Sequence, residues 1–271
     1  MNFLKRGFKA STKVIRDHKL LFISIIILQV VLISLLSYVS LTYQLKIIEG
    51  AQEVIEPLNN ANYDQESLQS GQPFTKDIVQ IYTGYKTMIR NVVEYILWLS
   101  GIFLLLNGAI WLLIYKMFGK KNYLEQAVKY VSSSLILTIP FFMVCYFILK
   151  GFLSIDIAPE AFASVIQVMS IVFLVIYYFL LVGFSQLQIK SWKKFSKSYY
   201  SLGIKKIVCT LTVLVINWCF IALAGYFIYL TAMYEVHLFI MFLSLMFLVI
   251  VLALSKIFWI ASLNSITTSE R

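Results

Sequence analysis

Charged and chemically reactive residues are scarce in this chain. Of its 271 residues only 13% are charged, and it contains two histidines, three cysteines and four prolines. No glycine-rich phosphate loop, helical histidine pair or paired-cysteine motif occurs. Nucleophilic catalysis and hydrolytic metal sites need clustered bases, thiols or carboxylates. We therefore expect no enzyme, no catalytic residue, no metal ion and no cofactor.

The long apolar runs also lack charge in their middle. Ion-coupled transporters usually place an ionisable residue near the bilayer midplane, so the sequence argues against a proton- or sodium-coupled mechanism. A facilitator for neutral or apolar cargo stays open. Cys145, Cys209 and Cys219 all lie in these runs with no histidine nearby, and they read as packing residues rather than a disulfide or metal framework.

What the sequence does contain is hydrophobic residues, at 60% of the chain with a mean hydropathy of +0.83. This composition is typical of a polytopic membrane protein. We predict an all-α transmembrane helix bundle, a single six-span membrane domain over residues 1–271. The predicted spans are 20–43, 92–115, 131–149, 162–184, 207–230 and 238–260.

A lysine-rich connection fixes the predicted orientation. Residues 190–206 hold six lysines and no acid between two apolar runs, and such short basic loops stay in the cytoplasm. Both termini are then cytoplasmic, in a cell membrane crossed several times. Most of the 23 Lys and Arg residues fall on inner segments and most of the 13 acids on outer ones. The excess of +10 therefore predicts anionic lipid headgroups, and no nucleic acid, as its partner.

Residues 1–19 combine six basic residues with Leu4, Phe8 and Ile15 at helical spacing. We predict a cytoplasmic amphipathic helix on the inner leaflet. A cleaved signal peptide is the alternative, but the following apolar run is long for that role and lacks a clean small-x-small cleavage site.

The helical apolar spacing continues beyond the first span and stops near Pro57, then resumes from Ile78 towards the second span. We predict an outer helical hairpin over 46–90, which offers residues 47–89 to a possible protein partner. A helix from Leu20 to Glu56 would be about 55 Å long, against roughly 30 Å of hydrocarbon. A polar loop without this structure is the alternative.

Uncharged polar, small and proline residues occur inside the spans. In lipid, small residues allow helices to approach and amides bond between helices, whereas proline kinks a helix. We interpret them as helix-packing residues, with the lining of a substrate path as the alternative: Gly101, Asn107, Gly108, Pro140, Gln167 and Asn217.

Several acids and one histidine fall at the predicted outer ends of spans. Such a patch is able to hold a divalent cation, although the topology alone also predicts a solvated acidic surface there. Its members are Glu94, Asp156, Glu160, Glu235 and His237.

The opening, with Phe8 in a basic helix that runs through Arg16, Asp17, His18 and Lys19 into Leu20, Leu21 and Phe22, resembles uncharacterised prokaryotic six-span membrane proteins. The nearest is the membrane domain that accompanies some glycerophosphodiester phosphodiesterases. The likeness covers about the first 40 residues and implies a membrane-embedded bundle without a transferable catalytic motif. The long outer hairpin departs from the compact loops expected there.

Three functions follow from these features. The first is a non-enzymatic scaffold or accessory subunit of a membrane complex, favoured by the uncharged spans and the projecting hairpin. The second is a transporter or permease for a neutral or lipid-like molecule, favoured by the polar positions inside the spans. The third is a lipid enzyme that uses the outer acidic patch.

Overall fold

A computed structural model describes residues 2–60, 78–119, 122–136, 139, 159–189, 191–234 and 237–268. Within these ranges every regular element is a helix, which confirms the predicted all-α class. The chain forms two compact units. Unit 1 comprises Met1–Gln29 and Gly108–Arg271, and unit 2 comprises Val30–Asn107.

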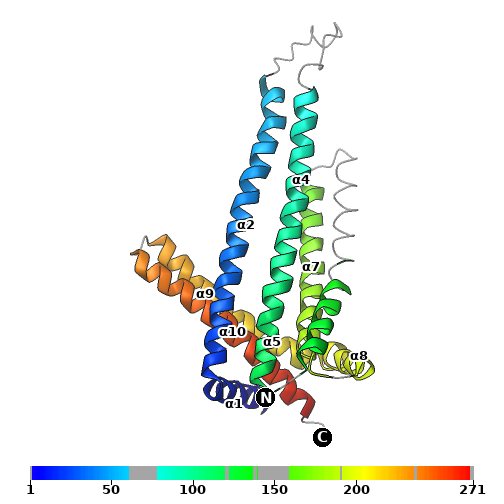
Figure 1. Cartoon of the computed structure of the whole chain (residues 1–271), viewed down its shortest axis with the longest axis vertical. Coiled ribbons are helices and arrows are strands. Elements are labelled where there is room, and N and C mark those ends of the chain that lie inside the picture. Colours follow the sequence, from blue (N-terminus) through cyan, green and yellow to red (C-terminus); the bar gives the residue numbers. More distant parts are fainter. Residues whose placement is uncertain are drawn as a thin grey trace. The chain divides into compact units, whose positions relative to one another are not determined.

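Unit 2 is built from two long helices that lie side by side (Figure 1). These are α2 (Lys19–Asn60), most of which belongs to this unit, and α4 (Ile78–Ile102), which continues into the π-helical turn η1 (Phe103–Asn107). Tyr95 Oη donates to Ser40 Oγ at 3.1 Å, and Asn91 Nδ2 donates to the Lys46 carbonyl at 3.3 Å. Because rising numbers on α2 meet falling numbers on α4, the pair is antiparallel.

Two glycines bring the backbones of α2 and α4 close together. A Cβ atom at Gly50 would lie 3.2 Å from the Met88 backbone nitrogen, and one at Gly84 would lie 2.9 Å from Glu53 Cβ. The second distance is too short for any larger residue unless the helices move apart. Glycine at both positions therefore allows the short distance between the backbones of α2 and α4.

Four helical stretches are long and apolar enough to cross a membrane: Lys19–Pro57, Val79–Met117, Ile207–Met233 and Leu238–Thr267. They cover the predicted first, second, fifth and sixth spans. The predicted fourth span corresponds to α7 (Pro159–Phe184), whose described apolar stretch is Ser170–Phe184. Most of the predicted third span lies outside the described residues, so six spans stay a prediction.

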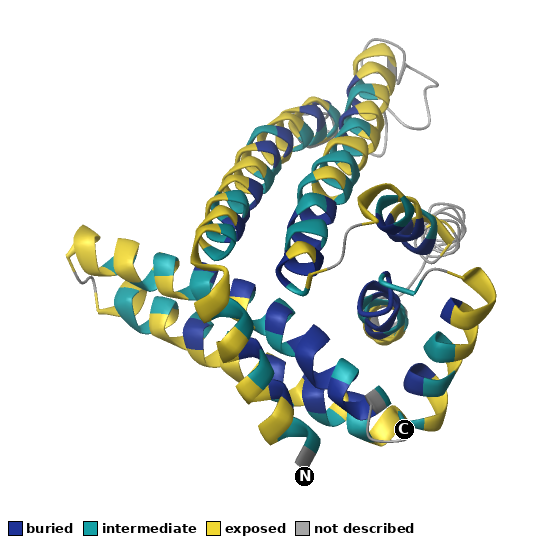
Figure 2. Cartoon of the chain, turned by 60° about the horizontal axis from the view of Figure 1, so that its bottom comes forward, coloured by how far each residue is buried: buried dark blue, intermediate teal, exposed yellow. Residues whose placement is uncertain are grey.

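Unit 1 is organised around α10 (Leu238–Thr268), which packs against both α9 (Ile207–Met233) and the short α1 (Asn2–Asp17). In Figure 1, α9 and α10 run side by side. Figure 2 shows the burial changing along α10, with exposed residues near its start and buried ones towards its end. Leu238 is 81% exposed, whereas Ile257 and Leu263 are 0% exposed. An exposed apolar surface of this kind is what a lipid-facing helix presents.

Helix α10 continues eight residues past the predicted end of the sixth span, from Ile260 to Thr268. The helix carries on through the polar residues Ser262, Asn264 and Ser265, which follow the apolar run. These side chains are accommodated by the helix itself: Ser265 Oγ donates to the Ser262 carbonyl at 2.7 Å, and Thr267 Oγ1 donates to the Asn264 carbonyl at 2.8 Å.

Lys256 is consequently a residue of the helix interior rather than of a helix end. Its Nζ donates to Gln29 Oε1 on the unit 1 part of α2 at 3.0 Å. Lys256 lies 18 residues after Leu238, which is about 27 Å along the helix. The Lys256 amine is paired with a side chain of α2 inside unit 1.

An aromatic cluster joins several other helices of unit 1. The ring of Phe184 lies 5.4 Å from that of Trp111 on α5 (Gly108–Met117) and 4.6 Å from that of Tyr130. Trp259 on α10 donates from Nε1 to the Leu181 carbonyl at 2.9 Å. The fixed ring geometry and satisfied donor make this cluster a rigid base for the adjoining helices.

Lys129 falls between the predicted second and third spans, where a basic inner loop is expected, but this part of the connection is helical. Residues 123–136 are helical, and Lys129 is 0% exposed. Its Nζ lies 2.6 Å from Glu125 Oε1, one turn earlier, and also donates to the Ile189 carbonyl. The ring of Trp192, the first residue of α8 (Trp192–Tyr200), lies 5.6 Å from the same ammonium. A buried lysine needs such partners, so Lys129 fixes this corner of the fold.

Candidate apolar ligand site

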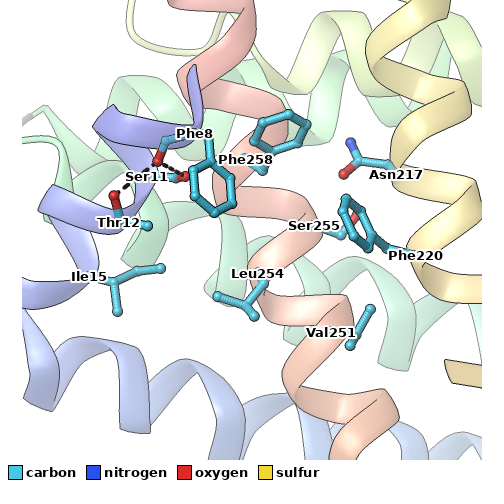
Figure 3. Close-up of a pocket in the computed structure, with 10 residues that line it drawn as sticks. All are labelled: Phe8, Ser11, Thr12, Ile15, Asn217, Phe220, Val251, Leu254, Ser255 and Phe258. Atoms are coloured by element: carbon cyan, nitrogen blue, oxygen red, sulfur yellow. Dashed lines mark hydrogen bonds between the residues drawn. The ribbon is translucent and has the colours of Figure 1, made fainter. Parts of the chain in front are cut away.

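A half-open cavity of about 230 Å³ lies in unit 1, lined by residues of α1, α9 and α10. Figure 3 shows side chains of α1 on one side, those of α9 on the other, and those of α10 between them. Ten residues line it: Phe8, Ser11, Thr12, Ile15, Asn217, Phe220, Val251, Leu254, Ser255 and Phe258. The volume exceeds the roughly 150 Å³ of an apolar protein cavity that binds benzene.

Helix α1 is held against α10 by small residues. A Cβ atom at Gly7 would lie 2.9 Å from Ser262 Cα, so only glycine allows this approach. Further along α10, Ser265 Oγ lies 2.9 Å from the Phe3 carbonyl and shares its one proton between this oxygen and the Ser262 carbonyl. These contacts place the next turns of α1, which contain Phe8 and Ser11, over the cavity.

The hydroxyl groups that α1 contributes to the cavity already have partners. Ser11 Oγ donates to the Phe8 carbonyl at 2.8 Å, and Thr12 Oγ1 lies 3.0 Å from the same carbonyl. Figure 3 draws both bonds within the helix. Because these hydroxyls bond to their own helix backbone, this wall of the cavity is effectively apolar.

Asn217 differs from the other lining residues. It is 4% exposed, and its Oδ1 has no hydrogen-bond partner. Three buried side-chain oxygens in the described part of the chain share that property, namely those of Gln126, Ser262 and Asn217, and Asn217 alone lines the cavity. An unsatisfied buried acceptor costs about 1–3 kcal/mol. In Figure 3 this oxygen is turned towards the α10 side of the cavity.

Asn217 lies on the buried face of α9, together with two other residues. Thr210, Asn217 and Ala224 follow each other at seven-residue spacing, and they are 0%, 4% and 0% exposed. Thr210 Oγ1 donates to the Leu202 carbonyl at 2.9 Å, so its polarity is satisfied where the chain enters α9 from the π-helical turn η2 (Ser201–Lys205). Asn217, two turns further along α9, lines the cavity, and its Oδ1 has no such partner.

The chemistry that the cavity permits is binding. None of its ten lining side chains is ionisable, and hydroxyls without an adjacent base are weak nucleophiles. Apolar walls with one placed polar group are typical of sites that hold small organic molecules.

The other described packing or pathway candidates do not line this cavity. In unit 1, a Cβ atom at Gly108 would lie 2.8 Å from Tyr130 Cε1, which is a close helix contact, and Gln167 is exposed on α7. In unit 2, Gly101 has open space around its Cα, and Asn107 is 4% exposed. Pro140 lies outside the described residues.

The predicted outer acidic patch is only partly described. Glu94 accepts a hydrogen bond from Tyr43 Oη at 3.2 Å and lies 3.9 Å from Arg90 Nε within unit 2. His237 is exposed in unit 1. Asp156, Glu235 and the side chain of Glu160 lie outside the described residues. Within the described ranges no three His, Cys, Asp or Glu side chains gather in a way that could hold a metal ion.

One titratable group near the chain's basic turn is strongly perturbed. Tyr199 on α8 has its pKa raised from 10.0 to about 12, chiefly by burial and further by the nearby Tyr178. Its ring lies 6.0 Å from that of Phe179 and 6.2 Å from that of Phe195. The neutral phenol therefore belongs to the packing of α8.

No protein-family model, curated protein or solved structure matches the chain. The resemblance to the membrane domain of glycerophosphodiester phosphodiesterases accordingly stays a prediction. Function has to be inferred from the chain's own residues.

Proposed function

We propose that this chain is a non-enzymatic integral membrane protein that binds a lipid-like molecule in the cavity between α1, α9 and α10. The observation that supports this most directly is the cavity itself: about 230 Å³, with aromatic and aliphatic walls and one buried amide. Of the functions open to the sequence, this favours a transporter or carrier of a neutral, lipid-like molecule.

The proposed depth of the cavity agrees with such a ligand. With Leu238 at the outer boundary, the lining residues Val251 and Phe258 on α10 would lie about 20 and 30 Å further in. That is the inner half of a bilayer core of roughly 30 Å. The cavity would then open among acyl chains beneath α1, whose exposed Lys9 and Lys13 would face inner-leaflet headgroups.

Mass spectrometry of the gently solubilised, purified protein tests this proposal. We expect the wild-type chain to retain a small apolar molecule and a Val251→Trp variant, which fills the cavity, to lose it. Leu245→Trp is the matched control, because Leu245 lies on the same helix, is 44% exposed and does not line the cavity. Retention of the same molecule by all three proteins would contradict the proposal.

A second candidate, a scaffold that presents residues 47–89 to a partner protein, is favoured by the length of α2. Its 42 residues span about 63 Å, roughly twice the hydrocarbon thickness. The close contacts at Gly50 and Gly84 lie beyond the predicted first span, so the part outside the membrane would be a rigid helix pair.

Gly84→Leu tests the scaffold candidate, because the larger side chain forces α4 away from Glu53. We expect a co-purifying partner protein to be lost from this variant and kept by Gly101→Leu, since a Cβ atom at Gly101 meets nothing within 4 Å. A deletion of 47–89 that leaves every co-purifying protein in place would exclude the scaffold role.

A further inference from the structure

The groups that line the cavity restrict the chemical class of the ligand that it can bind. Asn217 Oδ1 is an acceptor without a partner, and the lining residue itself is 4% exposed. A hydrocarbon chain alone would fill the space and still leave this acceptor unpaired. A ligand that carries a hydrogen-bond donor at the same depth satisfies it, and buried polar groups are almost always satisfied.

The residues that line the cavity also exclude a ligand whose hydrogen-bond donor is charged. An ammonium group would be buried without a carboxylate, because no acid lines the cavity, and an unpaired buried charge is strongly unfavourable. A carboxylate or phosphate oxygen has no proton to donate to Asn217. The basic side chains of α1, including Lys5, Lys9 and Lys13, are exposed and do not line the cavity. The donor therefore has to be neutral.

We propose that the cavity binds a neutral membrane lipid with a free hydroxyl group, whose apolar chain packs against the phenylalanines and whose hydroxyl donates to Asn217 Oδ1. This inference rests on the proposed function. A hydroxyl suits the site because it is small and because it both donates and accepts, which matches an amide that presents an oxygen and an NH₂ group. Asn217 is then the residue that distinguishes a hydroxyl lipid from a plain hydrocarbon.

Two photoactivatable probes test separately whether the cavity binds a lipid and whether it prefers one with a hydroxyl group. One is a long-chain alcohol with a diazirine on its chain, and the other is the methyl ether of the same alcohol, which lacks the donor. Full-length protein in nanodiscs is illuminated with each probe, and the labelled peptides are mapped. On the wild type we expect the alcohol to label peptides of α9 and α10 at about ten- to a hundredfold lower concentration than the ether.

Two variants complete the experiment. In Asn217→Leu the alcohol should lose its advantage while the ether labels as before, which also shows that the cavity is still folded. In Val251→Trp neither probe should label these peptides. Should Asn217→Leu not fold, the comparison of alcohol with ether on the wild type decides the question alone.

The possible failures are distinct. Absence of cavity labelling by both probes on the wild type would overturn the proposed function. Equal labelling by alcohol and ether, blocked by Val251→Trp, would leave lipid binding in place and overturn the hydroxyl assignment.

Discussion

Asn217→Leu should stabilise the lipid-free protein, although it alters a buried polar residue. Asn217 is 4% exposed and its Oδ1 has no partner, so the folded state bears the desolvation penalty of an unsatisfied acceptor, about 1–3 kcal/mol. Leucine removes that acceptor and adds apolar contact with the neighbouring phenylalanines. We expect the free energy of unfolding to rise by about 1–3 kcal/mol.

The matched control is Asn107→Leu. Asn107 is also 4% exposed, but it has an interacting partner, so the same substitution removes an interaction instead of an unsatisfied group. We expect it to lower the free energy of unfolding. Two asparagines of equal burial should therefore respond with opposite signs.

The measurement is unfolding by SDS titration of delipidated protein in detergent, followed by tryptophan fluorescence. Addition of a long-chain alcohol should stabilise the wild type more than Asn217→Leu, because a ligand stabilises only the state that binds it. If Asn217→Leu were destabilised as much as Asn107→Leu, the Asn217 oxygen would have a partner in the free protein, and the reasoning would be refuted.

Three further outcomes are expected. Lys129→Met should lower the free energy of unfolding by about 1–3 kcal/mol, because the Ile189 carbonyl and Glu125 lose a common donor. Adding Glu125→Gln to this variant should recover part of the loss. If Lys129→Met left the free energy of unfolding unchanged in the same SDS titration, the buried pair would not stabilise the fold. The folded-state pKa of Tyr199, about 12, exceeds its unfolded value of 10.0. The stability that burial of Tyr199 contributes is therefore complete below pH 10 and declines as the pH rises from 10 towards 12. In unfolding curves measured at alkaline pH, the Tyr199→Phe variant should not show this decline. A cysteine replacing Gln65 should react with a membrane-impermeant thiol reagent applied outside the cell and one replacing Ser196 should not, and the reverse pattern would invert the proposed orientation.

The sequence predicts those parts of the fold that depend on local periodicity. Long apolar runs marked four helices that the structure describes, and the apolar spacing past Tyr43 correctly extended α2 well beyond the first span. The basic segment before the first span is helical as expected, over Asn2–Asp17. These features need only neighbouring residues, so periodicity is sufficient to find them.

Features that depend on distant residues were missed. Lys129 lies in the connection between the predicted second and third spans, and the signal for its helix was Glu125 four residues earlier, the spacing of a helical ion pair. The contact of Ser265 near the end of α10 with the Phe3 carbonyl on α1 joins residues 262 positions apart, which no local pattern reveals. Asn217 was predicted as a packing or pathway residue because it is polar within a span, but its place at a cavity depends on residues 8–15, 217–220 and 251–258 together. No single stretch of sequence contains that information.

The contact between α1 and α10 has a consequence for biogenesis. Ser265 bonds to Phe3, a residue 262 positions away, so α1 waits for its partner while nearly the whole chain is synthesised. At about 5–20 residues per second that delay is on the order of 13–50 s, during which α1 lacks its contact with α10. The cavity is therefore incomplete until α10 has been made, and a chain that stops before α10 should lack the proposed ligand site.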